Sequence, residues 1–307
     1  MNGSYKMIAL DIDGTLLSSG YTISRRTRQA LRKAMEAGMI VTLATGRFWG
    51  SALRIARSIP VNAPVVSNDG ALIKDVYTGE ELYSRPLPLE LARHTLEKAQ
   101  KYPSLQVKIF LKDIILFAGP SYKKAQLGRI FHFARKFTLP GFINYVRDFV
   151  LVPAESVGNL KRALSLLKEA PTKVVVSGEP EEVEAFSREL SGELGEKIYI
   201  TTSVKNSIDI LEGSVSKAKG LEVLSGLLGI KREEIIAVGD NFNDLEMIKF
   251  AGLGVAMGNA PEAVKQRADF VTARNDEDGV ALLVEKVLSS KEHEQNIQVS
   301  DKIEFYT

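Results

Sequence analysis

The first eighty residues alternate short apolar runs with amphipathic stretches. Residues 24–38 (SRRTRQALRKAMEAG) have the spacing of an amphipathic helix that begins after Ser24 as N-cap and stops at Gly38, and 49–59 predicts a second helix. The intervening apolar runs have the length of buried strands and are MIAL at 7–10, MIVTLAT at 39–45 and APVVSN at 63–68. Continuously apolar strands that alternate with helices predict a parallel sheet covered on both faces.

The same alternation returns near the end of the chain. The predicted helices there are 217–229, 244–252, 260–268 and one from Gly279, and the predicted strands are 234–239, 253–257 and 269–272. We expect these segments to join the first ones in a single α/β fold, a Rossmann-like parallel sheet core.

The middle of the chain has a different pattern. Its predicted strands alternate as if half-exposed, at 105–111, 113–119, 144–152, 172–178 and 197–203, and its predicted helices are 89–101, 121–136, 156–169 and 180–194. This pattern predicts a separate α+β domain inserted into the first fold. The expected organisation is a core segment 1–84, an inserted cap 85–204 and a second core segment 205–307 with a polar tail from about 289.

The amino-acid composition argues against several classes of function. The net charge of the 307 residues is only +2, which argues against nucleic acid or a membrane surface as partner. The absence of cysteine excludes disulfides, thiolate nucleophiles and cysteine-built zinc sites, and the three histidines are too far apart in sequence for a metal-ligand spacing. Without an apolar signal region or a membrane-length apolar run, we expect a cytoplasmic protein.

Polar side chains follow three of the core strands at their carboxyl ends. They are Asp11 and Asp13 after the first strand, Thr45, Gly46 and Arg47 after the second, and Asp240, Asn241, Asn243 and Asp244 after the strand at 234–239. Ligands of open parallel sheets bind in the crevice at this edge. Because four carboxylates at one crevice repel each other, the arrangement requires a cation, and hard oxygen donors favour Mg²⁺ over zinc.

Each of these residues has an ordinary interpretation when it is taken alone. An aspartate after a strand is commonly a turn or capping residue. Gly14 is either a turn glycine or a point where the backbone approaches a phosphate closely. Arg47 is either a solvent-facing helix charge or a substrate contact. The convergence of three strand ends makes a site the better hypothesis.

Four motifs in this order resemble the haloacid-dehalogenase-like hydrolases. They are DIDGT at 11–15, ATGR at 44–47, the lysine in SVSKAKGLEVL at 214–224, and GDNFNDLEM at 239–247 followed by AGLGVAMGNA. More closely, the chain is similar to the Cof-type phosphatases with a large inserted cap. The resemblance implies a phosphoric monoester hydrolase that uses Mg²⁺ and acts on a small phosphorylated metabolite, such as a sugar phosphate, through an aspartyl-phosphate.

The resemblance also assigns roles to single residues. It implies that Asp11 is the nucleophile and a metal ligand, and that Asp13 is the general acid and base and binds the metal through its backbone carbonyl. Asp240 is the remaining protein ligand, and Asp244 holds Lys217 or the metal-bound waters. The residues expected to bind phosphate are Ile12, Thr45, Gly46, Lys217 and Asn243. One departure is Asp69, which stands where the family commonly has asparagine and adds negative charge near the mouth of the site.

Helix geometry separates Lys217 from its neighbour Lys219. Residues two apart on a helix point in nearly opposite directions, roughly 200° apart. Lys217 precedes Leu221 by four positions and Leu224 by seven, so it shares their buried face, whereas Lys219 faces solvent.

Two alternative functions stay open on the sequence alone. In a phosphomutase or phosphotransferase, a sugar rather than water would take the phosphoryl group from Asp11. In a regulatory phospho-acceptor domain, Asp11 would be phosphorylated without turnover of a substrate. The motif that follows Asp13 and the predicted cap favour the hydrolase.

Overall fold

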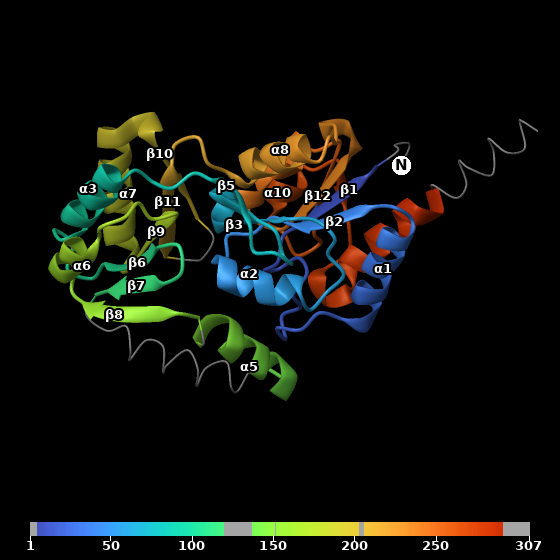
Figure 1. Cartoon of the computed structure of the whole chain (residues 1–307), viewed down its shortest axis with the longest axis horizontal. Coiled ribbons are helices and arrows are strands. Elements are labelled where there is room, and N and C mark those ends of the chain that lie inside the picture. Colours follow the sequence, from blue (N-terminus) through green and yellow to red (C-terminus); the bar gives the residue numbers. More distant parts are fainter. Residues whose placement is uncertain (1–4, 120–136, 151, 203–205, 291–307) are drawn as a thin grey trace, which may run out of the picture.

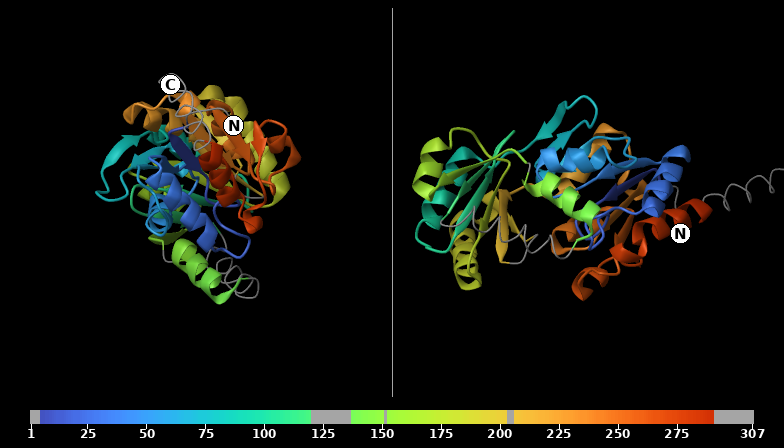
Figure 2. Two further views of the ribbon diagram at one scale, coloured as in Figure 1. Left: turned by 90° about the vertical axis from the view of Figure 1, so that its right-hand side faces the viewer. Right: turned by 90° about the horizontal axis from the view of Figure 1, so that it is seen from below.

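The computed structural model of the chain describes residues 5–119, 137–150, 152–202 and 206–290. Two bodies lie side by side along the longest axis of the molecule (Figure 1), and the view from below shows the same division (Figure 2). The predicted helix at 121–136 and most of the predicted polar tail lie outside the described residues.

The core is a parallel sheet built from both ends of the chain, in the order β14-β13-β12-β1-β2. Its strands are β1 (Met7–Leu10), β2 (Ile40–Leu43), β12 (Ile235–Gly239), β13 (Leu253–Ala256) and β14 (Phe270–Val271). Successive side chains of a strand point to opposite faces, and both faces are covered here. Ile8 and Leu10 enter one apolar cluster and Met7 and Ala9 another, which explains why the strand is apolar throughout.

Helices cover the two faces of this sheet as the sequence predicts. The first cluster is closed by α1 (Arg25–Glu36), α2 (Trp49–Ala56) and the helix at 279–290, and the second by α8 (Lys217–Leu227) and α9 (Leu245–Phe250). The short helix α10 (Glu262–Lys265) packs on β13. Ser24 caps α1 by accepting a hydrogen bond from the backbone of Thr27, and Gly38 follows the helix at φ 79°.

A small antiparallel sheet continues the core beyond β2. It contains β3 (Val65–Ser67), β4 (Leu72–Lys74) and β5 (Glu81–Ser84), and an isolated bridge from Ala44 to Val66 joins it to the end of β2. A one-turn 3-10 helix, η1 (Asn68–Gly70), connects β3 to β4. This turn lies next to the start of α8, with which it makes close contacts.

The second body is a mixed six-stranded sheet in the order β10-β11-β9-β6-β7-β8. Its strands are β6 (Gln106–Phe110), β7 (Ile115–Ala118), β8 (Ala154–Gly158), β9 (Lys173–Ser177), β10 (Ile198–Thr201) and β11 (Ser207–Glu212). One face is covered by α3 (Leu89–Ala99), α6 (Leu160–Leu166) and α7 (Pro180–Leu194). These helices lie on the side away from the core (Figure 1).

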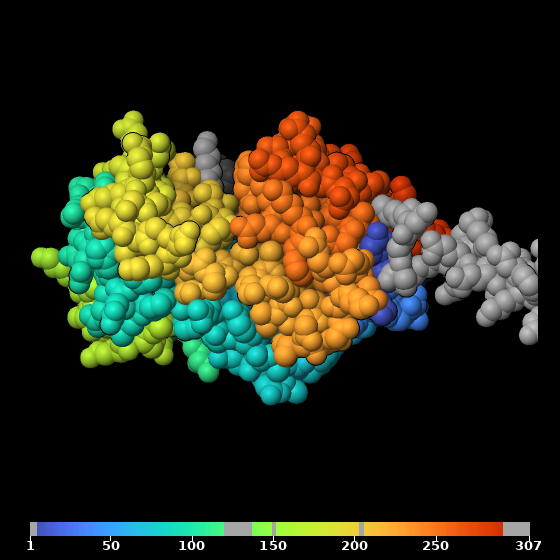
Figure 3. Space-filling model, turned by 90° about the horizontal axis from the view of Figure 1, so that it is seen from above, coloured from blue at the N-terminus to red at the C-terminus, as the bar shows by residue number. Residues whose placement is uncertain are grey.

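The other face of this sheet packs against the core. Phe48, at the start of α2, joins an apolar cluster with Phe110, Phe117 and Val175 of the sheet. For this reason β7 and β9 are buried rather than half-exposed as their alternation predicts. Seen from above, the second body lies directly against the second core segment (Figure 3).

Two local predictions for the inserted region are wrong, and one strand has no counterpart among the predictions. Residues 144–152, expected as a strand, are largely helical in α5 (Leu139–Tyr145) and the π-helix η2 (Val146–Val150), where Tyr145 packs against the core ring of Tyr21. The helix expected from 156 begins only at Leu160, after β8. The strand without a counterpart is β11, which pairs with both β9 and β10.

Among the described residues, no helix combines the length and apolar character needed to cross a membrane.

Candidate active site

The site lies where three core strands end at one edge of the sheet. Asp11 follows β1, and its backbone amide donates to the carbonyl of Val238 on β12, which fixes the two strand ends side by side. Asp240 follows β12 directly, and Thr45 lies just beyond β2. The structure therefore brings together the polar groups that the sequence predicted at this edge.

Lys217 lies between two carboxylates of this site. Its Nζ is 2.6 Å from Oδ1 of Asp11 and 2.6 Å from Oδ1 of Asp244. All three side chains are buried. Burial alone would lower the pKa of Lys217, but the charges of Asp11 and Asp244 outweigh it, so its pKa lies above that of an ordinary lysine. Lys217 is therefore a fixed positive charge.

The start of α8 places Lys217 as the helix geometry predicts. Ser216 is the N-cap and accepts a hydrogen bond from the backbone of Lys219. Lys217, Leu221 and Leu224 are on the buried face. The Lys219 side chain is exposed and pairs with Glu222 on the same helix.

The acidic residues form a cluster that fits a hard cation. One oxygen each of Asp11, Asp240 and Asp244 lies within 4.8 Å of the other two. Burial raises the pKa of Asp11 well above its ordinary value, against the effect of Lys217, and burial together with Asp244 raises the pKa of Asp240 to about 7. Burial is the main cause of both pKa shifts, and the neighbouring carboxylates add to it. Oxygen donors this close together suit a divalent ion.

In one residue of the cluster, Asp244, both carboxylate oxygens already accept hydrogen bonds from the protein. Oδ2 of Asp244 accepts the backbone amides of Asp240 and Asn241, both at 2.9 Å, while its Oδ1 accepts from Lys217. Asp244 thus orients the loop after β12 and the lysine. Asp240 receives a hydrogen bond of 3.0 Å from the hydroxyl of Thr15.

Position 14 must be glycine because the carboxylate of Asp240 leaves no room for a side chain there. Its φ is +81°, a conformation that side chains rarely adopt. A Cβ at this position would lie 2.2 Å from Oδ2 of Asp240. The close approach that the sequence left open is therefore to a carboxylate of the acidic cluster.

Arg47 is neither solvent-facing nor aimed at open space for a substrate. Its guanidinium is buried and donates two hydrogen bonds, of 2.7 and 2.6 Å, to the two oxygens of Asp13, and it also contacts Tyr21. Nη1 of Arg47 also lies 3.6 Å from Oδ2 of Asp148. This bidentate pair holds the half-exposed carboxylate of Asp13 in one orientation.

The other expected phosphate-binding residues follow different core strands: Ile12 follows β1, Thr45 and Gly46 follow β2, and Asn243 follows β12. Thr45 is buried, and its hydroxyl accepts the backbone amide of Arg47 at 3.2 Å. Ile12 is buried between the two aspartates. Asn243 donates from its side-chain amide to Asp69 at 3.1 Å, so its predicted donation to phosphate stays a prediction. Asp69 is buried rather than at an open mouth.

Sequence reasoning missed three residues that contact this site. Thr15 could have been found, because it belongs to the same short motif as Asp11. Lys173 and Asp148 come from the inserted region and meet the core only through tertiary packing. No local period or motif marks them.

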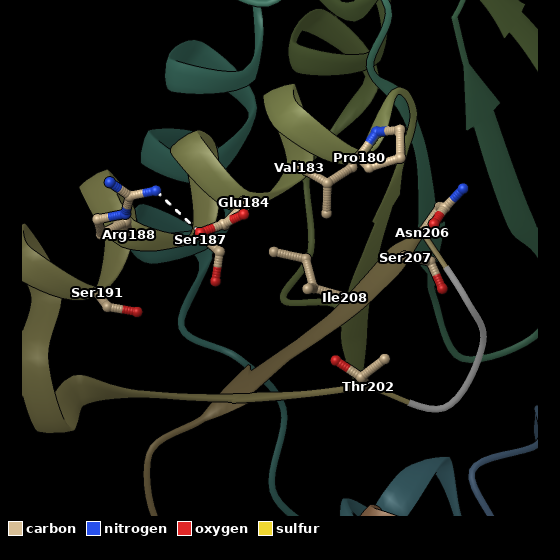
Figure 4. Close-up of a pocket in the computed structure, with 10 residues that line it drawn as sticks. All are labelled: Pro180, Val183, Glu184, Ser187, Arg188, Ser191, Thr202, Asn206, Ser207 and Ile208. Carbon is tan, nitrogen blue, oxygen red and sulfur yellow. Dashed lines mark hydrogen bonds and ion pairs between the residues drawn. The ribbon is translucent and has the colours of Figure 1, made fainter.

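A separate depression of about 510 Å³ lies on the inserted body between α7 and β11 (Figure 4). Val183 and Ile208 form its floor, and the exposed pair Glu184–Arg188 lies at one side. It contains none of the acidic residues described above, so it does not belong to the carboxylate site.

Comparison with known proteins agrees with the geometry. The model of the haloacid dehalogenase-like hydrolase family matches residues 8–284. A 5-amino-6-(5-phospho-D-ribitylamino)uracil phosphatase of Bacillus subtilis is 32% identical and aligns with 92% of this chain and 97% of its own length. A pyridoxal phosphate phosphatase of Escherichia coli is 28% identical, with coverages of 91% and 97%.

A solved structure shares the whole arrangement. A haloacid dehalogenase-like hydrolase from Bacteroides thetaiotaomicron superposes with a TM-score of 0.75 at 31% identity, over 92% of this chain and 99% of that one. The predicted fold and enzyme class are thereby confirmed over the alternative of a regulatory phospho-acceptor domain. The chain belongs to the haloacid dehalogenase-like hydrolases and, within them, to the Cof-type phosphatases, which hydrolyse phosphoric monoesters.

Proposed function

We propose that this protein is a Mg²⁺-dependent phosphatase that hydrolyses a small phosphorylated metabolite through an aspartyl-phosphate on Asp11. The observation that carries the proposal is the buried contact of Lys217 with both Asp11 and Asp244, each at 2.6 Å. A fixed cation beside a carboxylate nucleophile lowers the repulsion that a phosphate dianion meets when it approaches.

Asp11 attacks phosphorus and forms the acyl phosphate while the alcohol leaves. Asp13 gives its proton to the leaving oxygen, and the resulting carboxylate then accepts a proton from the attacking water. In the structure Arg47 holds Asp13 as an ion pair, so we propose that Asp13 turns away from Arg47 when the substrate binds. Thr45, Gly46 and Lys217 hold the non-bridging oxygens.

The carboxylates of Asp11 and Asp240 and the backbone carbonyl of Asp13 would hold Mg²⁺, which supplies positive charge to the transferring phosphoryl group. Asp244 stays bound to Lys217 and to the backbone after β12. In this arrangement Asp244 orients the site without contacting the substrate.

The inserted body would select the substrate, because it packs over the edge that carries the site. The two relatives described above are named for a ribitylaminouracil phosphate and for pyridoxal phosphate. Both are small phosphomonoesters, and we propose the same class of substrate here.

The direct test is phosphate release from a panel of sugar phosphates, nucleotides, pyridoxal phosphate and an aryl phosphate. Activity should vanish in excess chelator and return with added Mg²⁺. Full activity after exhaustive removal of metal would overturn the metal assignment. Phosphate transfer to a sugar acceptor, without release in its absence, would instead identify a phosphotransferase.

A further inference from the structure

One lysine of the inserted body reaches the turn that is expected to hold phosphate. Lys173, the first residue of β9, is buried, and its Nζ is 2.7 Å from the carbonyl oxygen of Gly46. The same nitrogen lies 2.8 Å from Oδ2 of Asp69 and 3.7 Å from Oδ2 of Asp209. The lysine therefore joins the two bodies at the site itself.

The preceding residue makes a parallel contact. Asn68 donates from its side-chain amide to the hydroxyl of Thr172 at 2.8 Å. Two consecutive residues before and at the start of β9 thus meet two consecutive residues of the core turn η1. Asn68 and Asp69 both have positive φ, at 50° and 55°, and asparagine and aspartate tolerate this conformation better than other side chains. The turn presents both side chains toward the inserted body.

The charges of this contact are matched. Burial raises the pKa of Asp69, but the charges of Lys173 and Lys217 lower it by more. The pKa of Asp69 is therefore below that of an ordinary aspartate. Burial lowers the pKa of Lys173, and Asp209 and Asp69 more than offset this. Lys173 and Asp69 are thus direct partners across the two bodies. Loss of either would leave the other buried with only a more distant counter-charge, Asp209 for Lys173 and Lys217 for Asp69.

Two other parts of the site depend on the same contact. Asp69 accepts the amide of Asn243, which lies in the loop after β12. The carbonyl of Gly46 belongs to the peptide unit whose N–H, that of Arg47, donates to Thr45. Because Lys173 holds the Gly46 carbonyl, it also fixes the plane of the peptide between Gly46 and Arg47 in the turn that is expected to bind phosphate.

We propose that Lys173 is a positioning residue through which the inserted body fixes the geometry of the Thr45–Gly46 turn. This inference rests on the proposed role of that turn in binding phosphate. Lys173 orients the Gly46 carbonyl and neutralises Asp69 beside the approaching dianion. Without Lys173, the Gly46 carbonyl loses its anchor and Asp69 loses its directly bonded cation, which weakens phosphate binding.

The test compares Lys173→Met with a matched control, Lys112→Met. Lys112 also belongs to the inserted body and pairs with a core carboxylate, Glu81, but at 3.6 Å and with its side chain 61% exposed. Lys173→Met should lower kcat/KM at least about tenfold, by the same factor for aryl and alkyl phosphates, because the turn contacts phosphate and not the leaving group. Lys112→Met should stay within about twofold of the wild type.

Binding of inorganic phosphate, measured by calorimetry, gives a readout that needs no turnover. Lys173→Met should weaken it by a factor similar to the loss in kcat/KM. If the wild-type protein binds phosphate but hydrolyses no ester, the proposed function is wrong. The comparison of phosphate affinity between the wild type and Lys173→Met still tests the role of Lys173. A kcat/KM loss confined to particular leaving groups would make Lys173 a substrate contact and overturn the positioning role.

A double variant covers the case in which Lys173→Met does not fold. Lys173→Met combined with Asp69→Asn removes both members of the directly bonded ion pair and leaves only the more distant Asp209 without Lys173, so it should fold more readily than Lys173→Met and recover part of the phosphate affinity. Because the Gly46 carbonyl still lacks its anchor, kcat/KM should remain below the wild-type value. Wild-type kcat/KM in the folded double variant would show that Lys173 only balances a charge, and the proposal would be wrong.

Discussion

At the scale of single residues, the buried ammonium of Lys217 separates two carboxylates that would otherwise repel each other. Without it, the buried carboxylates of Asp11 and Asp244 would lose the cation that contacts both of them. The same ammonium can contact a phosphoryl oxygen next to Asp11. Lys217 is therefore expected to matter for catalysis as well as for the local structure.

Lys217→Ala should lower kcat by at least about two orders of magnitude, the scale of losing one preorganised donor to developing negative charge. Lys219→Ala, on the exposed face of the same helix, should remain within a few-fold of the wild type. Steady-state kinetics with an aryl phosphate measure both, and circular dichroism shows whether each variant is folded. Reversed effects would contradict the facing of α8 and the phosphate-binding role.

Asp13 has a distinct signature because its proton goes to the leaving group. Asp13→Asn cannot protonate the leaving oxygen, so its kcat should fall more for alkyl phosphates, whose alcohols have a high pKa, than for an activated aryl phosphate. The ratio of the two losses is the measurement. Equal losses on both substrates would exclude Asp13 as the general acid.

The residues that the sequence located are those that chain topology alone brings together. Asp11, Thr45 and Asp240 follow strands of one parallel sheet, and the carboxyl ends of such strands share an edge. The environment of Arg47 was ambiguous because only the side-chain positions show that its guanidinium binds Asp13 and does not face solvent. Lys173 was invisible because Gly46 and Asp69 lie more than a hundred positions before it.

At the scale of elements, the position of α8 depends on how closely it approaches the turn η1. A Cβ on Gly220 would lie 2.5 Å from Cγ1 of Val66 and 2.9 Å from Cα of Gly70. Gly226, on the same helix, is exposed and has no atom in that range. The two glycines therefore offer a comparison in which only the packing differs.

Gly220→Ala should destabilise the protein by about 1–3 kcal/mol through overpacking and lower kcat/KM, because α8 must shift with Lys217 at its first turn. Gly226→Ala should instead stabilise it by about 0.5–1 kcal/mol, since alanine is the better helix former. Denaturant unfolding and kinetics on both variants test this. An active, stabilised Gly220→Ala variant would show that the contact with η1 does not set the helix position.

Helices with clear caps and apolar faces were predicted closely, as α1 and α8 show. The segment at 144–152 was not, because its alternating pattern also places Tyr145 and Asp148 one helical turn apart on the side that faces the core. Tertiary contacts decide between the two periods there. β11 is buried along nearly its whole length between β9 and β10, so its environment follows from tertiary pairing.

At the scale of the whole molecule, metal binding should be visible in stability. The crowded carboxylates of Asp11 and Asp240 gain a counter-charge when a divalent ion binds the folded state only. Mg²⁺ at about a hundred times its Kd should stabilise the protein by about 2.7 kcal/mol, which raises the melting temperature. Asp240→Asn should show a much smaller rise in a thermal scan, and an equal rise would place the ion elsewhere.

The parallel core could be predicted as a whole because each strand is apolar on both faces and alternates with helices. How the inserted body sits on the core could not, because it depends on side chains such as Phe48 and Lys173 that meet across the two bodies. We propose that the substrate is selected at this same junction. It is therefore the part of the function about which the sequence says least.

The central claim is that Asp11 carries the phosphoryl group during turnover. The most direct measurement is a rapid acid quench of wild type and Asp11→Asn with an aryl phosphate and Mg²⁺, followed by mass spectrometry of the peptide that contains residue 11. We expect the mass of one added phosphoryl group on Asp11 in the wild type and none in the variant. Hydrolysis in which no phosphoryl group appears on Asp11, with Asp11→Asn still active, would contradict it.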